Sequence, residues 1–402
     1  MFHSMSRALA RVSLLALAGV TVAAAAPVTI NSEQRAATAL MTASLLSNNQ
    51  GYYNSLLLER TVFYARLALQ TASSVTTPAA LLATPAGVTV PCQTSGSMTA
   101  RLAPSYPRVF KFQWNACVYN VGPFPNSLDG PGEIVLLSDD FAPKNVASIH
   151  FGSATRDLVQ TQDVVFPFAA FHDRNTRNLR LTGVVPMTVS QFSVPNGSSP
   201  FAFVTTGFID LDQTNDNIGT GQPPSEAGAR LTYEFVAFAG NLSYNADATI
   251  YDEDITALTG KQTYTRRNPP PYGTSSEISN FQGLRTHNIT DFNTLTKTRT
   301  IDGKLDFTWD PNFGAGCVNG GYQFRTNSAL HGAAFSQPDL DSGEITINNV
   351  ARTTFYSPAN VPPTLPVPVN GMLIHSAVQG VGVFNYDAHS LFEGIRPIAH
   401  CG

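Results

Sequence analysis

The spacing of hydrophobic and polar positions changes near residue 80. From about Thr89 onward, apolar residues alternate with polar ones in short runs, and Gly, Pro, Asn and Asp separate the runs. This period of two is typical of half-buried antiparallel strands. Met98, Ala100 and Leu102 alternate in this way. Further runs of the same kind are Phe110–Trp114, Val184–Val189, Phe201–Asp210, Leu231–Phe238, Leu242–Tyr251, Leu284–Asp291 and Gly380–Tyr386.

One segment has the pattern of a β-hairpin. Two runs rich in strand-forming residues, Thr294–Ile301 and Lys304–Trp309, flank the dipeptide Asp302-Gly303. Asp-Gly tolerates the positive φ angles of a type I′ turn, so the pattern predicts a hairpin centred there. Four threonines at alternate positions would line one face of its first arm, and that face is polar enough to meet water: Thr294, Thr296, Thr298 and Thr300.

Residues 31–74 have a helical period instead. Asn31 and Gln34 have the spacing of a helix cap and its third residue. Two apolar stripes follow, Ala37/Leu40/Met41/Leu45 and Leu58/Val62/Ala65/Leu69. Asn48–Gly51 interrupts the pattern between them, and Pro78 and Pro85 end the helical part. We expect a helical hairpin packed on a sheet, with a docking helix for a partner as the alternative.

These patterns divide the chain into a helical segment, residues 26–78, and a β-rich region, residues 79–402. The predicted fold is mainly β: one or two antiparallel sheets, as a sandwich or a curved open sheet, carrying the N-terminal helical hairpin. Both tryptophans, Trp114 and Trp309, precede a cysteine, and a Gly-Glu-Ile sequence follows each. The β-rich region could therefore hold two diverged β-units, residues 79–225 and 226–402.

The first 25 residues have the pattern of a cleavable export signal. Arg7 and Arg11 precede the apolar segment Val12–Val22, and the alanine run Ala23–Ala26 offers small residues to a signal peptidase. Eleven residues are too few to cross about 30 Å of hydrocarbon as a helix. Because Pro27 is a poor residue directly after a cut, we expect cleavage after Ala25. No cysteine follows the apolar segment, so we expect no lipid anchor. The predicted location is the periplasm or the cell exterior.

Charge excludes some partners. Loss of the two signal arginines changes the formal net charge from −4 to 22 − 28 = −6. Nucleic acids and anionic membrane surfaces attract basic patches, so the sequence argues against both. No later segment has 18 consecutive apolar residues, so we expect no transmembrane helix after signal cleavage. Charged residues make up only 13% of the chain, and Thr, Ser, Asn and Gln supply much of the polar surface. This surface suits contact with another surface or a polymer through hydrogen bonds.

All four cysteines follow the predicted signal, and an even count in an exported chain indicates disulfides. We predict the pairs Cys92–Cys117 and Cys317–Cys401, because each then lies within one part of the chain. A zinc site is the alternative, but no two cysteines have the C-x₂₋₄-C spacing that such sites use.

The sequence has no catalytic or cofactor motif. It contains no G-x-S-x-G, no H-E-x-x-H, no phosphate-binding G-x-x-x-x-G-K-[ST] and no complete G-x-G-x-x-G. Asp210, Asp212 and Asp216 place carboxylates at even-numbered positions after a β-run, and such spacing could turn several oxygens onto one Ca²⁺ ion. The alternative is a solvated loop of Asx-turns. Calcium is the only cofactor that the sequence suggests, and we expect no calcium effect.

The acidic tripeptide Asp252–Asp254 could supply the paired carboxylates of a glycosidase, although charges at a strand end are usually solvated. The leading interpretation is therefore a non-catalytic binding or structural protein. The alternatives are a secreted hydrolase of glycans or polymers and a carrier of apolar ligands. A hydrolase needs a cleft in which two carboxylates converge, whereas a carrier needs an apolar pocket.

Overall fold

A computed structural model describes the following residues: 25–105, 108–121, 124–136, 140–141, 146–166, 171–182, 187–189, 201–217, 227–245, 247, 249–267, 274–309, 319–334, 340–389, 391, 395 and 398. The protein is mainly β and antiparallel, as predicted, and 18 strands form one sheet. The strands are β1 Val88–Pro91, β2 Ser95–Ala103, β3 Arg108–Val121, β4 Phe124–Leu136, β5 Val146–Phe151, β6 Leu158–Phe166, β7 Phe171–Thr182, β8 Met187–Val189, β9 Phe201–Asn217, β10 Ala227–Tyr244, β11 Ile250–Arg267, β12 Thr274–Asp291, β13 Thr296–Trp309, β14 Gly320–Ala333, β15 Leu340–Ile347, β16 Ala351–Tyr356, β17 Met372–Val378 and β18 Gly382–Ala388.

The strands pair in chain order as a long meander, with one branch. β4 pairs with both β5 and β6, and β7 pairs with β5, β6 and β9. From β9 to β18 each strand pairs with the next. β9 and β10, the strands before and after the suggested boundary between residues 225 and 226, pair along most of their length.

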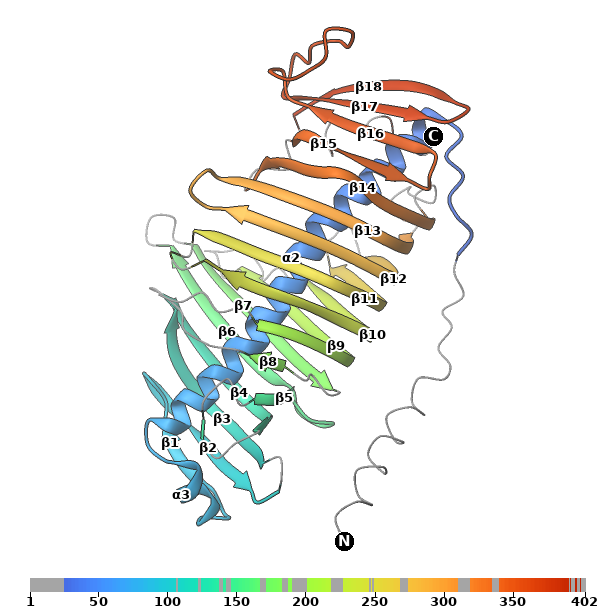
Figure 1. The fold of residues 1–402 in the computed structure, drawn as a ribbon. Coiled ribbons are helices and arrows are strands. Elements are labelled where there is room, and N and C mark those ends of the chain that lie inside the picture. Colours follow the sequence, from blue (N-terminus) through green and yellow to red (C-terminus); the bar gives the residue numbers. More distant parts are fainter. Residues whose placement is uncertain are drawn as a thin grey trace.

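One long helix, α2 (Glu33–Ser73), crosses a single face of this sheet from the β14–β18 end toward β1–β3 (Figure 1). Its 41 residues span about 61 Å at 1.5 Å per residue. A short second helix, α3 (Pro78–Leu82), follows beside β2. We call the sheet face that α2 crosses the inner face and the opposite one the outer face.

Alanines allow α2 to lie close to the sheet. Near its start, Ala36, Ala37, Ala39 and Leu40 are buried, and near its end Ala65, Ala68, Leu69 and Ala72 are buried. The two ends contact different strands. Thr42 bonds to the hydroxyl of Tyr322 on β14, and burial raises the pKa of that tyrosine to about 12. The ring of Tyr64 lies 6.0 Å from that of Phe151 on β5. The helix therefore ties distant parts of the meander into one apolar core.

The predicted helical hairpin is wrong, because α2 continues through Asn48–Gly51. A glycine inside a helix costs about 1 kcal/mol relative to alanine, and packing along a sheet can outweigh that penalty. The cap is Ser32 rather than Asn31, and its side chain accepts from the Arg35 amide. Of the predicted stripe residues, Ala37, Leu40, Met41, Ala65 and Leu69 are buried. The side chains of Leu45, Leu58 and Val62 lie outside the described set.

The predicted hairpin at Asp302-Gly303 is also wrong. β13 runs through both residues. The turn precedes β13, at residues 292–295 between β12 and β13. There the Asp291 carboxylate accepts the amides of Asn293 and Thr294. The positive φ of Gly303, 125°, belongs to a β-bulge, because the pairing register shifts beside it. Asp-Gly thus supplies the unusual backbone angle that the sequence suggested, but within a strand.

The disulfide Cys92–Cys117 is confirmed. The two Cα atoms are 5.5 Å apart at the open end of the β2–β3 hairpin. The second predicted pair, Cys317–Cys401, lies outside the described residues, as do residues 1–24 of the predicted signal, residues 1–25. Within the described part of the chain, no helix combines the length and apolar character that a membrane span requires.

Candidate functional site

A buried polar cluster lies on the inner face of β11, β12 and β13. Glu253, Asn288 and Arg299 occupy paired positions on these three neighbouring strands. The Asn288 amide nitrogen donates to Oε1 of Glu253 at 2.9 Å, and Nε of Arg299 donates to Oδ1 of Asn288 at 2.9 Å. These side chains are only 2%, 3% and 8% exposed. Asn288 therefore links a buried carboxylate to a buried guanidinium.

A second polar row adjoins this cluster toward the strand ends. Tyr251, Thr290 and Lys297 occupy the paired positions. Burial, followed by repulsion from Arg299, lowers the pKa of Lys297 to about 8, although attraction by Glu253 opposes the shift. Burial likewise lowers the pKa of Arg299 to about 10. Both cations are thus held in a poorly solvated region.

The charges of the cluster do not balance. Lys297 and Arg299 contribute two positive charges and Glu253 one negative charge, which leaves a net +1. Across the described part of the chain, no carboxylate forms an ion pair with Lys297. Because buried charges are normally paired, this surplus favours an anion at the site.

An apolar band continues from the cluster along the same face. Ile255 and Ile301 lie on either side of Thr286, and the next inward positions hold Leu258 and Leu284. Phe238 on β10 pairs with Leu258. The five apolar side chains are at most 1% exposed, and Thr286 is 6% exposed. The inner face therefore carries a cationic polar end that continues into a fully buried apolar band.

Asp252 and Glu253, the adjacent carboxylates of the acidic tripeptide, do not form a catalytic pair. Successive residues of a strand point to opposite faces. Glu253 lies on the inner face, whereas Asp252 lies on the outer face and pairs with His287, Oδ1 to Nε2 at 2.8 Å. Asp252 and Glu253 therefore cannot converge on one glycosidic bond, and the expectation of a solvated turn is wrong for Glu253.

A similar row of hydrogen-bonded side chains crosses β4, β6 and β7. Gln160 donates to Asn126 at 2.7 Å, and Arg177 donates to Gln160 at 2.8 Å. Asn126 and Gln160 are buried at 3% exposure each. Polar links between neighbouring strands thus recur among the buried side chains, and the β11–β13 cluster differs from this one in containing a buried carboxylate and a second cation.

The three predicted calcium ligands lie in a strand rather than a loop. Asp210, Asp212 and Asp216 belong to β9, and the side chains of Asp210 and Asp216 lie outside the described set. The register sets arginines opposite each of them: Arg180, Arg230 and Arg174. Among the described residues, no group of three or more His, Cys, Asp or Glu side chains is arranged to hold a metal ion. The expectation that calcium has no effect stays a prediction.

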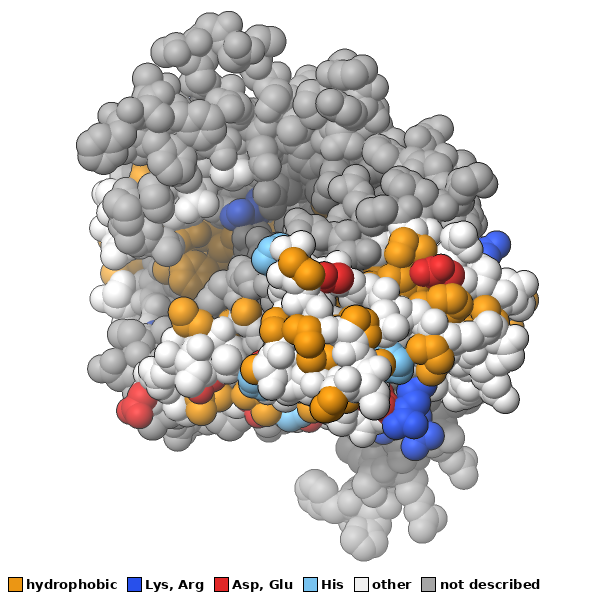
Figure 2. All heavy atoms as spheres, turned by 90° about the horizontal axis from the view of Figure 1, so that it is seen from above, with side chains coloured by type: hydrophobic (Ala, Val, Ile, Leu, Met, Phe, Trp, Pro, Cys, Tyr) orange, Lys and Arg blue, Asp and Glu red, His pale blue; other side chains and the backbone are white. Residues whose placement is uncertain are grey.

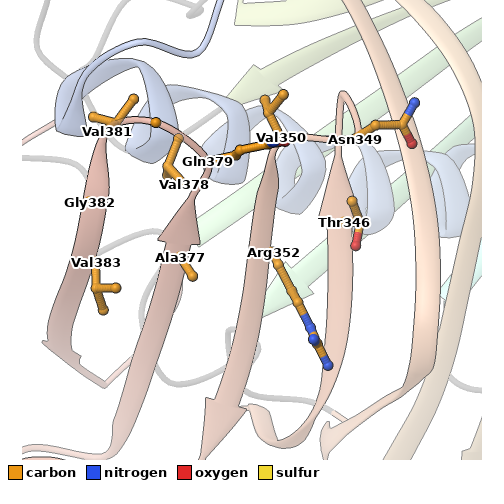
Figure 3. Close-up of a pocket in the computed structure, with 11 residues that line it drawn as sticks. Thr346, Asn349, Val350, Arg352, Ala377, Val378, Gln379, Val381, Gly382 and Val383 are labelled. Atoms are coloured by element: carbon orange, nitrogen blue, oxygen red, sulfur yellow. The ribbon is translucent and has the colours of Figure 1, made fainter.

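A shallow groove of about 670 Å³ lies at the β15–β18 end (Figure 3). Val350, Val378 and Val381 line its turn side, while Arg352 extends along the strands. Nε of Arg352 already pairs with Glu344 at 2.7 Å. Seen from above, this end of the molecule carries apolar side chains scattered among polar ones (Figure 2). The groove contains no second charged group that could support catalysis.

Sequence analysis missed Asn288, Lys297 and Arg299, although the alternation of residues in this segment indicated two of them. If Thr296, Thr298 and Thr300 face water, the residues between them must face inward, and these include Lys297 and Arg299. Comparison of the chain with models of protein families, with curated proteins and with solved structures finds no match, so only the site itself indicates a function.

Proposed function

We propose that this protein is an exported, non-catalytic binding protein that holds a long-chain carboxylate on the inner face of its sheet, beside α2. Lys297 would contact the carboxylate, Arg299 would add its positive charge, and the apolar band from Ile255 to Leu258 would contact the alkyl chain. The observation that carries the proposal is the surplus positive charge of the half-buried Lys297 beside the buried Glu253–Asn288–Arg299 cluster and an apolar band.

Charge compensation supports a monoanionic head group. One carboxylate would reduce the net charge of the cluster from +1 to zero. Arg299 is held in place by Asn288, and it adds positive charge beside Lys297. Hydrogen bonds between such charged donors and a carboxylate are roughly twice as strong as neutral ones.

The apolar band supports a long alkyl chain. Ligand pockets are mostly apolar, with a small number of polar groups that fix orientation. Each CH₂ group removed from water contributes about 0.8 kcal/mol. Affinity should therefore rise with chain length while the position of the head group stays the same.

Two general features of the structure are compatible with a location outside the cytoplasm. The Cys92–Cys117 disulfide and the lack of a membrane-spanning helix in the described residues are compatible with an exported β-protein. The opposite orientation of Asp252 and Glu253 removes the carboxylate pair that had suggested a hydrolase.

Titration with a fluorescent or isotopically labelled C16 carboxylate tests the proposal. We expect saturable binding by the wild-type protein and at least tenfold weaker binding by Lys297→Met. Lys304→Met is the matched control, because Lys304 lies on the same strand but is exposed on the outer face. The C16 alcohol should bind the wild-type protein more weakly and should not distinguish the two variants.

Two results would overturn the proposal. The first is a wild-type protein that does not bind the carboxylate, and the second is equal binding by wild type and Lys297→Met. Either result would leave the cluster with a purely structural role, in which the Glu253–Asn288–Arg299 bonds fix the strand register.

A further inference from the structure

The segment that precedes α2 is attached to the sheet at the start of β14. The amide of Val28 donates to the carbonyl of Gly321 at 2.9 Å, and the amide of Gly321 donates to Ala26 at 3.1 Å. The pairing of β14 with β15 begins only at Phe324. Residues 26–28 therefore fill the place beside the first residues of β14, where Pro27 and Gly321 form a parallel bridge.

Two glycines make this attachment possible. A Cβ atom on Gly320 would lie 2.4 Å from Cγ2 of Val28. A Cβ atom on Gly321 would lie 3.0 Å from the carbonyl oxygen of Ala25 and 3.2 Å from Oδ1 of Asp306. Because Gly321 has no side chain, the chain can cross it and reach Asp306 on the neighbouring strand β13.

Ala25 ends this path at a buried carboxylate. Its backbone nitrogen lies 2.9 Å from Oδ2 of Asp306, which also accepts from Nε2 of Gln282 at 2.9 Å. Asp306 is only 8% exposed. In the part of the chain that the structure describes, no Lys, Arg or His forms an ion pair with this carboxylate. A buried carboxylate usually has a cationic partner.

We propose that the mature chain begins at Ala25 and that its new α-ammonium group is the missing partner of Asp306. A signal peptidase would hydrolyse the Ala24–Ala25 peptide bond with one water molecule, leaving a carboxylate on Ala24 and an amino group on Ala25. With a usual pKa of about 7.7–8.0, that amino group is mostly protonated at neutral pH. A neutral N–H···O bond would become a charge-assisted one.

This inference moves the cut one residue from the position that the sequence suggested. A chain that began at Ala26 would carry its ammonium group one residue farther from Asp306. The inference rests on the predicted export signal and is independent of the proposed ligand. Processing would then complete the attachment of the N-terminus to β13 and β14.

Intact-mass analysis tests the cut. The full chain is expressed in a bacterial host that exports it, and the exported protein should have the mass of residues 25–402 with one or more disulfides. A protein that begins at Ala26, or that keeps residues 1–24, would overturn the inference.

Urea unfolding of three chains, released from fusions so that they begin at Ala24, Ala25 or Ala26, tests the pairing. The Ala25 chain should have the highest midpoint, with a folding equilibrium constant roughly fivefold to tenfold above the Ala26 chain. Asp306→Asn is the matched variant, because asparagine keeps an acceptor oxygen and removes only the charge. With Asp306→Asn, the chains that begin at Ala25 and Ala26 should have the same urea midpoint. A midpoint that is still higher for the Ala25 chain would exclude an ion pair with Asp306.

Discussion

Asp252 and Glu253 are adjacent in the chain but lie on opposite faces of β11. Oδ1 of Asp252 lies 2.8 Å from Nε2 of His287 in a half-exposed pair, whereas Glu253 is 2% exposed and accepts from Asn288 on the inner face. The same chemical group thus has two environments one residue apart. The difference arises because a strand turns successive side chains to opposite sides.

The first prediction compares these two carboxylates. Glu253→Gln should destabilise the protein by about 3–5 kcal/mol, because Arg299 and Lys297 would lose the attraction of a buried negative charge. Asp252→Asn should cost at most about 1 kcal/mol, since an exposed pair is screened by water. Urea unfolding followed by tryptophan fluorescence measures both. Equal losses would mean that the inner cluster is solvated.

The second prediction concerns the bulge at Gly303. Alanine there would bring its Cβ atom to 2.6 Å from the Gly283 carbonyl oxygen and 2.7 Å from the Leu284 Cα atom, at a φ of 125°. We expect Gly303→Ala to destabilise the protein by about 2–4 kcal/mol. Gly283→Ala is the control: its φ is also positive, but nothing lies within 4 Å, so about 1 kcal/mol is expected. If both glycines tolerate alanine equally, β13 does not pass through Gly303 as described.

The two hairpin predictions fail for related reasons. The sequence predicted a turn at Asp302-Gly303 and a helix break at Asn48–Gly51, and both segments contain residues that weaken regular structure locally. In each case an extended contact with the rest of the sheet maintains the element: β13 pairs on both sides, and α2 packs along the inner face. Local preferences amount to about 1 kcal/mol per residue, and tertiary packing overrides them.

The strand periods and the Cys92–Cys117 pair could be predicted because both depend on neighbouring parts of the chain. The inner cluster could not be fully predicted. Glu253, Asn288 and Arg299 come together only when the registers of two strand pairs are known, and a one-residue slip would turn them to the other face. The contact of Ala25 with Asp306 spans 281 residues and has no local signal.

The third prediction concerns the disulfides. Peptide mapping without reduction should recover Cys92 linked to Cys117, and the sequence predicts Cys317 linked to Cys401 as the second pair. Replacing Cys92 and Cys117 with serine should cost about 3.5 kcal/mol, since the bond closes a loop of 25 residues. Recovery of a 117–317 linkage would contradict the structure of the β2–β3 hairpin.

The fourth prediction concerns calcium. The backbone register of β9 with β7 and β10 sets an arginine position opposite each of Asp210, Asp212 and Asp216, and opposite charges at paired positions can stabilise a sheet without a metal. We therefore expect millimolar calcium to leave the melting temperature of the wild-type protein unchanged. If calcium raises the melting temperature and Asp212→Ala abolishes the rise, these aspartates bind the ion, and opposite charges at paired strand positions do not explain their role.

The last prediction follows from the environment of Lys297. Burial lowers its pKa from 10.5 to about 8, so between pH 8 and 10.5 the unfolded chain binds more protons at this residue than the folded protein does. Under linkage, the free energy of unfolding then rises with pH in that window. Below pH 8 the lysine is charged in both states, and the full penalty of holding the cation in the folded protein is present.

Lys297→Met should therefore stabilise the ligand-free protein at pH 7 and remove the rise in stability between pH 8 and 10. The measurement is a series of urea midpoints, and it stops at pH 10 because tyrosines such as Tyr322 begin to affect stability above that value. Lys304→Met, on the exposed outer face, should keep the wild-type pH dependence. If both variants keep it, Lys297 is fully solvated and the cluster has no surplus charge to offer an anion. If only Lys297→Met loses it and that variant also loses carboxylate binding, the residue gives up stability for function, as binding-site residues commonly do.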